Sequence, residues 1–230
     1  MIITEITPQK RRKDRYNLYC EEGFLLSLSD ETIVKNSIKK GADLSSALIE
    51  KLRREDTLKY AKELAASFIS YCPRTRREVI THLEKKGIDS VSAEQAADML
   101  EEYRYIDDEE YAREFSRIYS SKLGSRMIKQ KLMQKGISSE AAEAASKANS
   151  QTQMEAGKKI CEKYAKKYAA LDSYERNKKI YAALIRKGFS YDEASMLVKE
   201  DEDVYEWLRR FLYSLKPRIF ASLSLTLYFY

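Results

Sequence analysis

The spacing of apolar residues along the chain changes near residue 29, from a strand-like to a helical period. Before that point, residues 2–6 are apolar and β-branched, residues 16–20 alternate partly between apolar and polar side chains, and residues 24–28 are again apolar. Glu21-Glu22-Gly23 is a turn signal between the last two runs. Runs of this length separated by turn residues predict a small β-hairpin region at the N-terminus.

The pattern that follows is typical of two short helices. Ser29 or Asp30 can cap the first of them, and Gly41 is expected to end it. A second helix is predicted from about Leu44 to Arg54. The first 55 residues therefore read as a strand and helix region that precedes the rest of the chain.

After Asp56 the chain repeats itself, and each copy contains the same arrangement of apolar residues followed by Lys-Gly. The three copies are Val79-x-x-x-Leu83-x-x-Lys86-Gly87-Ile88, Ile128-x-x-x-Leu132-x-x-Lys135-Gly136-Ile137 and Ile180-x-x-x-Leu184-x-x-Lys187-Gly188-Phe189. Apolar residues four apart lie on one face of a helix. Glycine directly after such a helix is typical of a left-handed C-terminal cap. We therefore predict a helix end with positive φ at each of the three glycines.

A further helix is expected after each glycine, and another before each apolar pair. The predicted N-caps of the later helices are Ser92, Ser138 and Ser190, of which the first and last have capping-box spacing to Gln95 and Glu193. The earlier helices carry apolar stripes, with Ala61, Ala65, Phe68 and Ile69 in the first copy, Ala112, Phe115 and Tyr119 in the second, and Ala156, Ile160 and Tyr164 less clearly in the third. Each copy is therefore a three-helix unit.

Units of this size bury little apolar surface alone, so neighbouring units are expected to stack. The predicted fold is mainly α, with tandem three-helix repeats in a curved elongated array beside a small N-terminal β-hairpin and helix region. A single compact helical bundle is the alternative, which the three matched gaps between helices disfavour. The expected boundaries are 1–55 for the N-terminal region, 56–106, 107–150 and 151–205 for the repeats, and 206–230 for a C-terminal tail.

The C-terminal segment Ile219–Tyr230 differs from everything before it, because it is uncharged and rich in Phe, Tyr and Leu. It is shorter than the roughly 20 residues that span a bilayer. We interpret it as a non-native tail or as a segment that packs on the last helices. Its β-prone composition also marks it as an aggregation liability, so it is expected to be dispensable.

Composition supports helices and an anionic partner. The chain has only 7 glycines and 3 prolines, whereas turn-rich β folds need many of both. The net charge of +6 favours a partner such as nucleic acid, although a merely solvated surface is an open alternative. Cys20, Cys72 and Cys161 form no CxxC pair, which indicates reduced thiols in the cytoplasm. The N-terminus has no apolar run after a charged segment, so neither a secretion signal nor membrane association is expected.

Candidate catalytic chemistry is absent from the sequence pattern. His82 is the only histidine and has no cysteine near it in sequence, which favours a structural role over a triad or metal site. The acidic run Asp107-Asp108-Glu109-Glu110 falls where a helix begins, and carboxylates there stabilise the helix dipole. No Walker-type phosphate loop occurs. We therefore expect no catalytic residue, metal or cofactor.

Basic side chains are the candidate binding residues. Arg74, Arg76 and Arg77 stand at a predicted helix N-terminus, where the dipole disfavours cations, so either a contact role or a solvated patch is open. Lys10–Lys13 is interpreted as a solvated loop, and packing is the default role for the 17 tyrosines. The predicted partner-binding residues are Arg74, Arg76, Arg77, Arg126, Lys129, Lys131 and Lys135.

Several stretches, in this order and spacing, resemble the RecX family, which regulates the RecA recombinase. They are Ile38-Lys39-Lys40-Gly41-Ala42-Asp43-Leu44, Pro73-Arg74-Thr75-Arg76-Arg77-Glu78-Val79, Tyr105-Ile106-Asp107-Asp108-Glu109-Glu110-Tyr111-Ala112 and Gly124-Ser125-Arg126-Met127-Ile128 with the Lys-Gly segments after them. The resemblance runs from about residue 2 to about residue 205. The chain departs from the family at Cys72, where a basic residue is common, and in its diffuse third repeat.

This resemblance implies a cytoplasmic, monomeric protein that lodges in the groove of the RecA–DNA filament. There it would limit filament growth and dampen ATP hydrolysis and strand exchange, and contact with DNA within the filament is left open. The alternative is a helical module that binds DNA directly, without a recombinase partner. Salt dependence separates the two in part, because binding to phosphates alone weakens steeply with salt.

Overall fold

The structure is a computed structural model that describes residues 1–10 and 12–198. The chain divides into two compact units, Met1–Asp108 and Glu109–Tyr230. The predictions made for the tail, residues 206–230, and for Ile219–Tyr230 within it lie outside the described residues.

The predicted N-terminal strands form an antiparallel sheet with the order β1-β2-β3. The strands are β1 (Glu5–Pro8), β2 (Arg15–Cys20) and β3 (Gly23–Ser29). β1 begins later than the apolar run from residue 2 suggested, because Ile2 forms an isolated bridge with Asp43 and Ile3 donates to the Ala42 carbonyl at 3.0 Å. The first residues therefore tie the sheet to the segment after the first helix.

The first helix, α1 (Asp30–Lys35), has the predicted Ser29 cap but ends earlier than Gly41, so that part of the prediction is wrong. Ser37 takes a positive φ of 50°, and the Ile38 N–H bonds to the Ile33 carbonyl at 3.0 Å. This turn buries Ile38 to 5% exposure. The helix therefore ends where the chain turns to bury Ile38. Gly41 lies in a later turn, where its φ is +87°.

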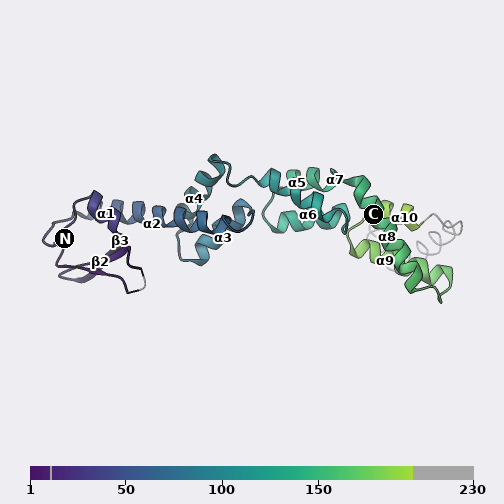
Figure 1. Ribbon diagram of the computed structural model, residues 1–230, viewed down its shortest axis with the longest axis horizontal. Coiled ribbons are helices and arrows are strands. Elements are labelled where there is room, and N and C mark those ends of the chain that lie inside the picture. Colours follow the sequence, from purple (N-terminus) through teal and green to yellow (C-terminus); the bar gives the residue numbers. More distant parts are fainter. Residues whose placement is uncertain (11, 199–230) are drawn as a thin grey trace, which may run out of the picture. The chain divides into compact units, whose positions relative to one another are not determined.

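The two helices expected on either side of Asp56 are one helix, α2 (Ser46–Ile69). Its first half packs Ile49 and Leu52 against the sheet. Its second half packs against α3 (Arg76–Lys85) and α4 (Ser90–Glu102). No Gly or Pro interrupts α2, so nothing in the local sequence stops it at Asp56. One helix therefore joins the N-terminal sheet to the first repeat (Figure 1).

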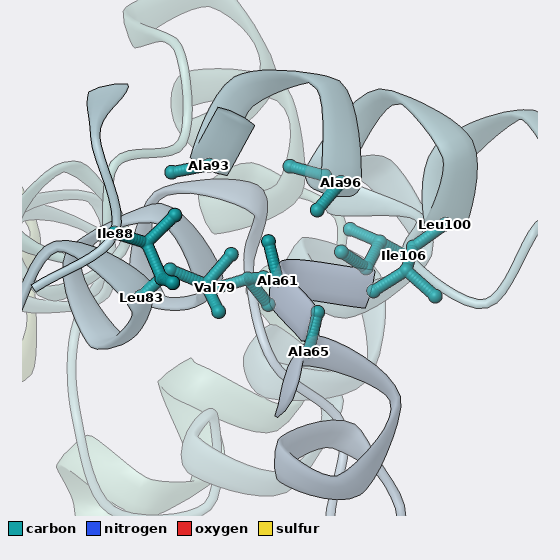
Figure 2. Packing of buried hydrophobic residues seen from close by; sticks show 10 residues of the cluster. Ala61, Ala65, Val79, Leu83, Ile88, Ala93, Ala96, Leu100 and Ile106 are labelled. Carbon is teal, nitrogen blue, oxygen red and sulfur yellow. The ribbon is translucent and has the colours of Figure 1, made fainter. Parts of the chain in front are cut away.

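The first repeat has a core of small and branched residues from three helices. Figure 2 shows Ala61 and Ala65 of α2 facing Val79 and Leu83 of α3. Alanines on α2 and α4 allow close approach of the helices, and larger residues from α3 and the connecting turns fill the remaining space. The buried members are Ala61, Ala65, Val79, Leu83, Ile88, Ala93, Ala96, Ala97, Leu100 and Ile106.

The second unit contains the other two predicted repeats. One consists of α5 (Asp108–Tyr119), whose first residue belongs to the first unit, α6 (Ser125–Gln134) and α7 (Ser139–Lys147). The other consists of α8 (Ser150–Lys167), α9 (Ser173–Arg186) and α10 (Tyr191–Val198). Each has its own apolar core, centred on the Ile128–Leu132 pair and on the Ile180–Leu184 pair. The mainly helical fold with three-helix repeats is confirmed.

The Lys-Gly helix ends are confirmed in all three repeats. Gly87, Gly136 and Gly188 have φ of +84°, +94° and +88°. In each copy the apolar residue after the glycine donates its N–H to the carbonyl of the last buried leucine, at 3.1–3.2 Å. These residues, Ile88, Ile137 and Phe189, are at most 7% exposed. The repeated motif therefore folds the chain back onto the helix it has just left.

Two of the three predicted serine caps are confirmed. Ser138 accepts from the Ala141 N–H at 3.2 Å, and Ser190 forms a capping box with Glu193. The prediction for Ser92 is wrong, because Asp89 caps α4 and accepts from the Ser92 N–H at 2.9 Å. Asp and Ser are caps of similar strength, and the carboxylate of Asp89 also complements the helix dipole.

Candidate partner-binding surfaces

The three predicted arginines of the first unit lie at the start of α3, as expected. Their surroundings differ from one arginine to the next. Thr75 caps the helix in a capping box with Glu78, so Arg76 and Arg77 are its first two residues and Arg74 precedes the cap. Cations at these positions oppose the helix dipole. The contacts that offset this cost differ among the three arginines.

Arg76 is held by acidic groups of its own unit. Its Nη2 donates to Asp98 of α4, its Nε lies 3.3 Å from Glu101, and its backbone N–H donates to Asp108 at 2.9 Å. The hydrogen bond to Asp98 is the main cause of the raised pKa of Arg76. These contacts offset the unfavourable dipole and join α3 to α4. We infer that Arg76 has a structural role in addition to any binding role.

Arg74 and Arg77 are placed differently from Arg76. The guanidinium of Arg74 lies over the Phe68 ring, 4.5 Å from its centre, and its Nε is buried without a hydrogen-bond partner among the described residues. Arg77 is exposed, and no ion pair holds it within the described part of the chain. Of the three arginines, Arg77 is thus the one whose charge is available to a partner without breaking an internal contact.

His82 takes part in the packing around Arg74. Its ring stacks on Phe68 at 4.0 Å between centroids, with an interplanar angle of 6°. Burial, followed by the charges of Lys86 and Arg74, lowers the pKa of His82. The structural role expected for this histidine agrees with its position between α2 and α3.

We expect His82 to titrate below its ordinary pKa of 6.5. Because the folded pKa is lowered, neutral His82 stabilises the fold above the unfolded pKa, and that contribution is lost as pH falls through the folded value. The signals of this single histidine in a nuclear magnetic resonance titration measure it directly. A midpoint at or above 6.5 in the folded protein would contradict the packing described for His82, and His82→Phe should flatten the stability change between pH 7 and 5.5.

The four other predicted residues, three on α6 and Lys135 at its C-cap, fall on two flanks of that helix. Arg126 and Lys129 line an open groove of about 560 Å³ between α6 and α7, together with Gln130, Met133, Gln134 and Glu143. Lys131 and Lys135 are not among the groove residues. Lys135 instead lies over the Tyr111 ring of α5 at 5.3 Å. The structure therefore brings Arg126 and Lys129 together in the groove, and Lys131 and Lys135 lie on the other flank of the helix.

Within the groove, Arg126 and Lys129 differ in how firmly they are held. Lys129 pairs with Glu143 of α7 at 2.6 Å, and Glu143 also accepts Lys147 at 2.5 Å. These two lysines lower the pKa of Glu143. Arg126 is exposed and lies over the Tyr191 ring at 5.3 Å. Lys129 thus joins α6 to α7, while Arg126 is open to a partner on one side.

The acidic run Asp107–Glu110 lies at the start of α5, whose first three residues are acidic. Asp108 accepts the Arg76 N–H, and burial raises its pKa. Within the described residues, no group of three or more His, Cys, Asp and Glu side chains is arranged to hold a metal ion. The part of the chain that the structure describes also has no helix with the length and apolar character needed to cross a membrane.

Sequence reasoning missed several neighbours of the predicted residues. The acidic partners of Arg76 lie 22 and 25 residues further along the chain, so local spacing does not indicate them. Met133 and Tyr191 are exposed at 44% and 62% although they look like core residues in the sequence. The default role of packing also fails for Tyr71, Tyr103 and Tyr105, which are exposed as well, whereas Tyr119 stacks on Phe115 with 4.3 Å between the ring centroids.

Models of four protein domains match the chain in order. They are the RecX N-terminal domain at residues 1–45 and the first, second and third RecX three-helix domains at 61–100, 107–145 and 151–198. Together they cover the N-terminal sheet and all three repeats.

Individual relatives and solved structures agree with the domain models. "Regulatory protein RecX" of Lactobacillus johnsonii is 40% identical over 114 residues, which are 50% of this chain and 42% of that protein. The Staphylococcus saprophyticus protein of the same name is 40% identical over 48% of this chain and 40% of its own length. The matched segment thus spans about two fifths of each relative.

Two crystal structures have the same fold. One of a regulatory protein RecX aligns with a TM-score of 0.64 and 26% identity, over 86% of this chain and 99% of that chain. The other, RecX from Lactobacillus salivarius, aligns with a TM-score of 0.60 and 30% identity, over 64% of this chain and 97% of that chain.

Proposed function

The chain belongs to the RecX family of regulatory proteins, and we propose that it binds the filament that the RecA recombinase forms on DNA and restrains it. The observation that carries the proposal is the ordered run of all four RecX domains from residue 1 to 198. By limiting the ATPase and strand exchange of the filament, such a protein modulates DNA repair, recombination and the SOS response.

We infer that this regulation works by binding and not by catalysis. The relatives are named regulatory proteins, and the residues conspicuous in the sequence, His82 and the acidic run at 107–110, have structural contacts. Stacked helical repeats offer extended surfaces to large partners. The same proposal places the protein in the cytoplasm as a monomer without a cofactor, with its exposed basic side chains toward the filament.

The predicted binding residues divide into those free to contact a partner and those already held. Arg77 and Lys131 are exposed and have no ion pair among the described residues, and the exposed guanidinium of Arg126 lies over the Tyr191 ring. Arg76 and Lys129 are paired to acids. We propose that the first group provides the contacts, and that Arg74, Arg76, Lys129 and Lys135 contribute mainly by holding the surface in place.

Adjacent arginines allow a matched test of this division. Arg77→Ala should weaken co-sedimentation with RecA filaments about 5- to 30-fold, the effect of losing about 1–2 kcal/mol at an interface, with an unchanged melting temperature. Arg76→Ala should instead lower stability by about 1 kcal/mol through its lost surface ion pairs. Normal filament binding by the Arg77→Ala variant would show that Arg77 is a solvated surface residue without a contact role.

A further inference from the structure

A second groove lies on the last repeat, and none of the predicted binding residues lines it. It is an open groove of about 710 Å³ along α9, which we call the α9 groove. Three cations and three aromatic residues are among the side chains that line it. They are Lys178, Lys179, Arg186, Tyr168, Tyr181 and Tyr191.

Charge is the first property that distinguishes the α9 groove. None of the described residues that line it is acidic, whereas the α6–α7 groove contains Glu143 and a groove beside the N-terminal sheet contains Asp14, Asp56 and Glu63. Residues 151–198 hold ten Lys and Arg against six Asp and Glu, a net +4 of the +6 carried by the chain. The last repeat is therefore the main cationic part of the described chain.

The cations of the α9 groove are only loosely engaged inside the protein. Lys178 lies 3.4 Å from Glu175 in an exposed pair, of a kind that contributes little to stability. Lys179 and Arg186 are exposed, and no acid pairs with either within the described residues. Eight residues separate Lys178 from Arg186, a rise of about 12 Å along a helix. Cations over that length match several phosphates of one strand, which rises about 3.4 Å per nucleotide.

Aromatic rings lie beside these charges. Tyr191 is 62% exposed and carries Arg126 over its ring at 5.3 Å. Tyr168 lies between Lys167 at 5.3 Å and Lys179 at 5.5 Å. Proteins that bind single-stranded nucleic acid combine a cationic groove along the backbone with aromatic rings on which bases stack. Duplex bases are stacked on one another, so ring faces of this kind suit an unpaired strand.

We propose that the α9 groove binds a single strand of DNA, with its lysines and Arg186 at the phosphates and Tyr191 stacked on a base. The choice of DNA over RNA rests on the proposed function, because the filament partner is formed on DNA. The contact itself needs no recombinase. It adds a nucleic-acid site on the third repeat, made of residues other than those predicted on α3.

Fluorescence anisotropy of a labelled 20-nucleotide oligo-dT with the full chain alone tests the site. The variant Lys178→Gln/Lys179→Gln/Arg186→Gln should bind at least 10-fold more weakly, and its salt dependence should be shallower by about two in log–log slope. The control Lys39→Gln/Lys40→Gln/Lys86→Gln removes the same charge from exposed sites in the first unit and should bind like the parent. Tyr191→Ala should weaken binding about 5-fold or more, and Tyr191→Phe should not.

The possible outcomes separate this inference from the proposed function. Equal loss in the groove variant and its control, or no binding of oligo-dT by the parent chain, overturns the site. A groove variant that binds oligo-dT normally but fails to co-sediment with filaments overturns it too, and assigns the groove to a protein surface. Tighter binding to oligo-rU overturns the assignment to DNA. If the parent chain binds oligo-dT through the groove but never co-sediments with RecA filaments, the site stands and the proposed function fails.

Discussion

Asp56→Ala is expected to lower the free energy of unfolding by about 3–5 kcal/mol, because it removes one partner of a buried ion pair. Asp56 is 3% exposed in its side chain and accepts Arg15 Nη2 at 2.6 Å. The same carboxylate accepts the Ser29 N–H at 2.8 Å and the Thr32 hydroxyl at 3.3 Å. One side chain of α2 thereby joins β2, the end of β3 and the start of α1.

Alanine at position 56 would leave the Arg15 guanidinium and the Ser29 N–H without this acceptor in a largely buried site. Unsatisfied buried groups of this kind carry the full cost of desolvation. The neighbouring Glu55 gives a control, since its pair with Lys51 is exposed and 3.9 Å long, so Glu55→Ala should cost less than about 0.5 kcal/mol. Urea denaturation followed by circular dichroism measures both. Equal small losses in the two variants would contradict the role given to Asp56.

Gly188→Ala should lower the free energy of unfolding by about 2–5 kcal/mol, more than the same change at Gly87. Both glycines have positive φ, which costs an alanine about 1–2 kcal/mol. Around Gly87 there is open space, but a Cβ at Gly188 would come closer than 3.0 Å to the backbone and Cβ of Met127 on α6. Overpacking of that kind adds about 1–3 kcal/mol.

The close approach at Gly188 exists because two repeats are hydrogen-bonded through their backbones. The Gly124 N–H donates to the Lys187 carbonyl at 3.0 Å, and the Arg126 N–H donates to the Gly188 carbonyl at 3.0 Å. The start of α6, which has no side-chain cap, is thus capped by the end of α9. Thermal melts of Gly87→Ala and Gly188→Ala compare the sites. If the two variants lose the same stability, the contact between these repeats is not as tight as described.

Local patterns were enough to predict the repeated parts of the fold. The Lys-Gly ends, the buried pairs and the caps at Ser138 and Ser190 depend on residues within one turn of each other, and all of them are confirmed. The error at Ser92 has a local cause as well, because Asp89 competes for the same N–H groups. Sequence spacing cannot rank two nearby caps of similar strength.

Long-range contacts account for what the sequence could not predict. Asp56 reads as the start of a helix, but its partner Arg15 lies 41 residues earlier, and the helix runs through it. Arg76 reads as a free surface cation until α4 brings Asp98 to it. The α9 groove depends on Tyr168, Lys179 and Tyr191, which belong to three different segments. None of these pairings has a periodic or motif signal.

Regulation of the filament is the central claim, and DNA-dependent ATP hydrolysis by preformed RecA filaments tests it most directly. The chain should be added at rising concentration while co-sedimentation with the filaments is measured in the same samples. We predict that the hydrolysis rate falls as the chain becomes bound. An unchanged rate in samples where the chain co-sediments, or no co-sedimentation at all, would contradict the proposed function.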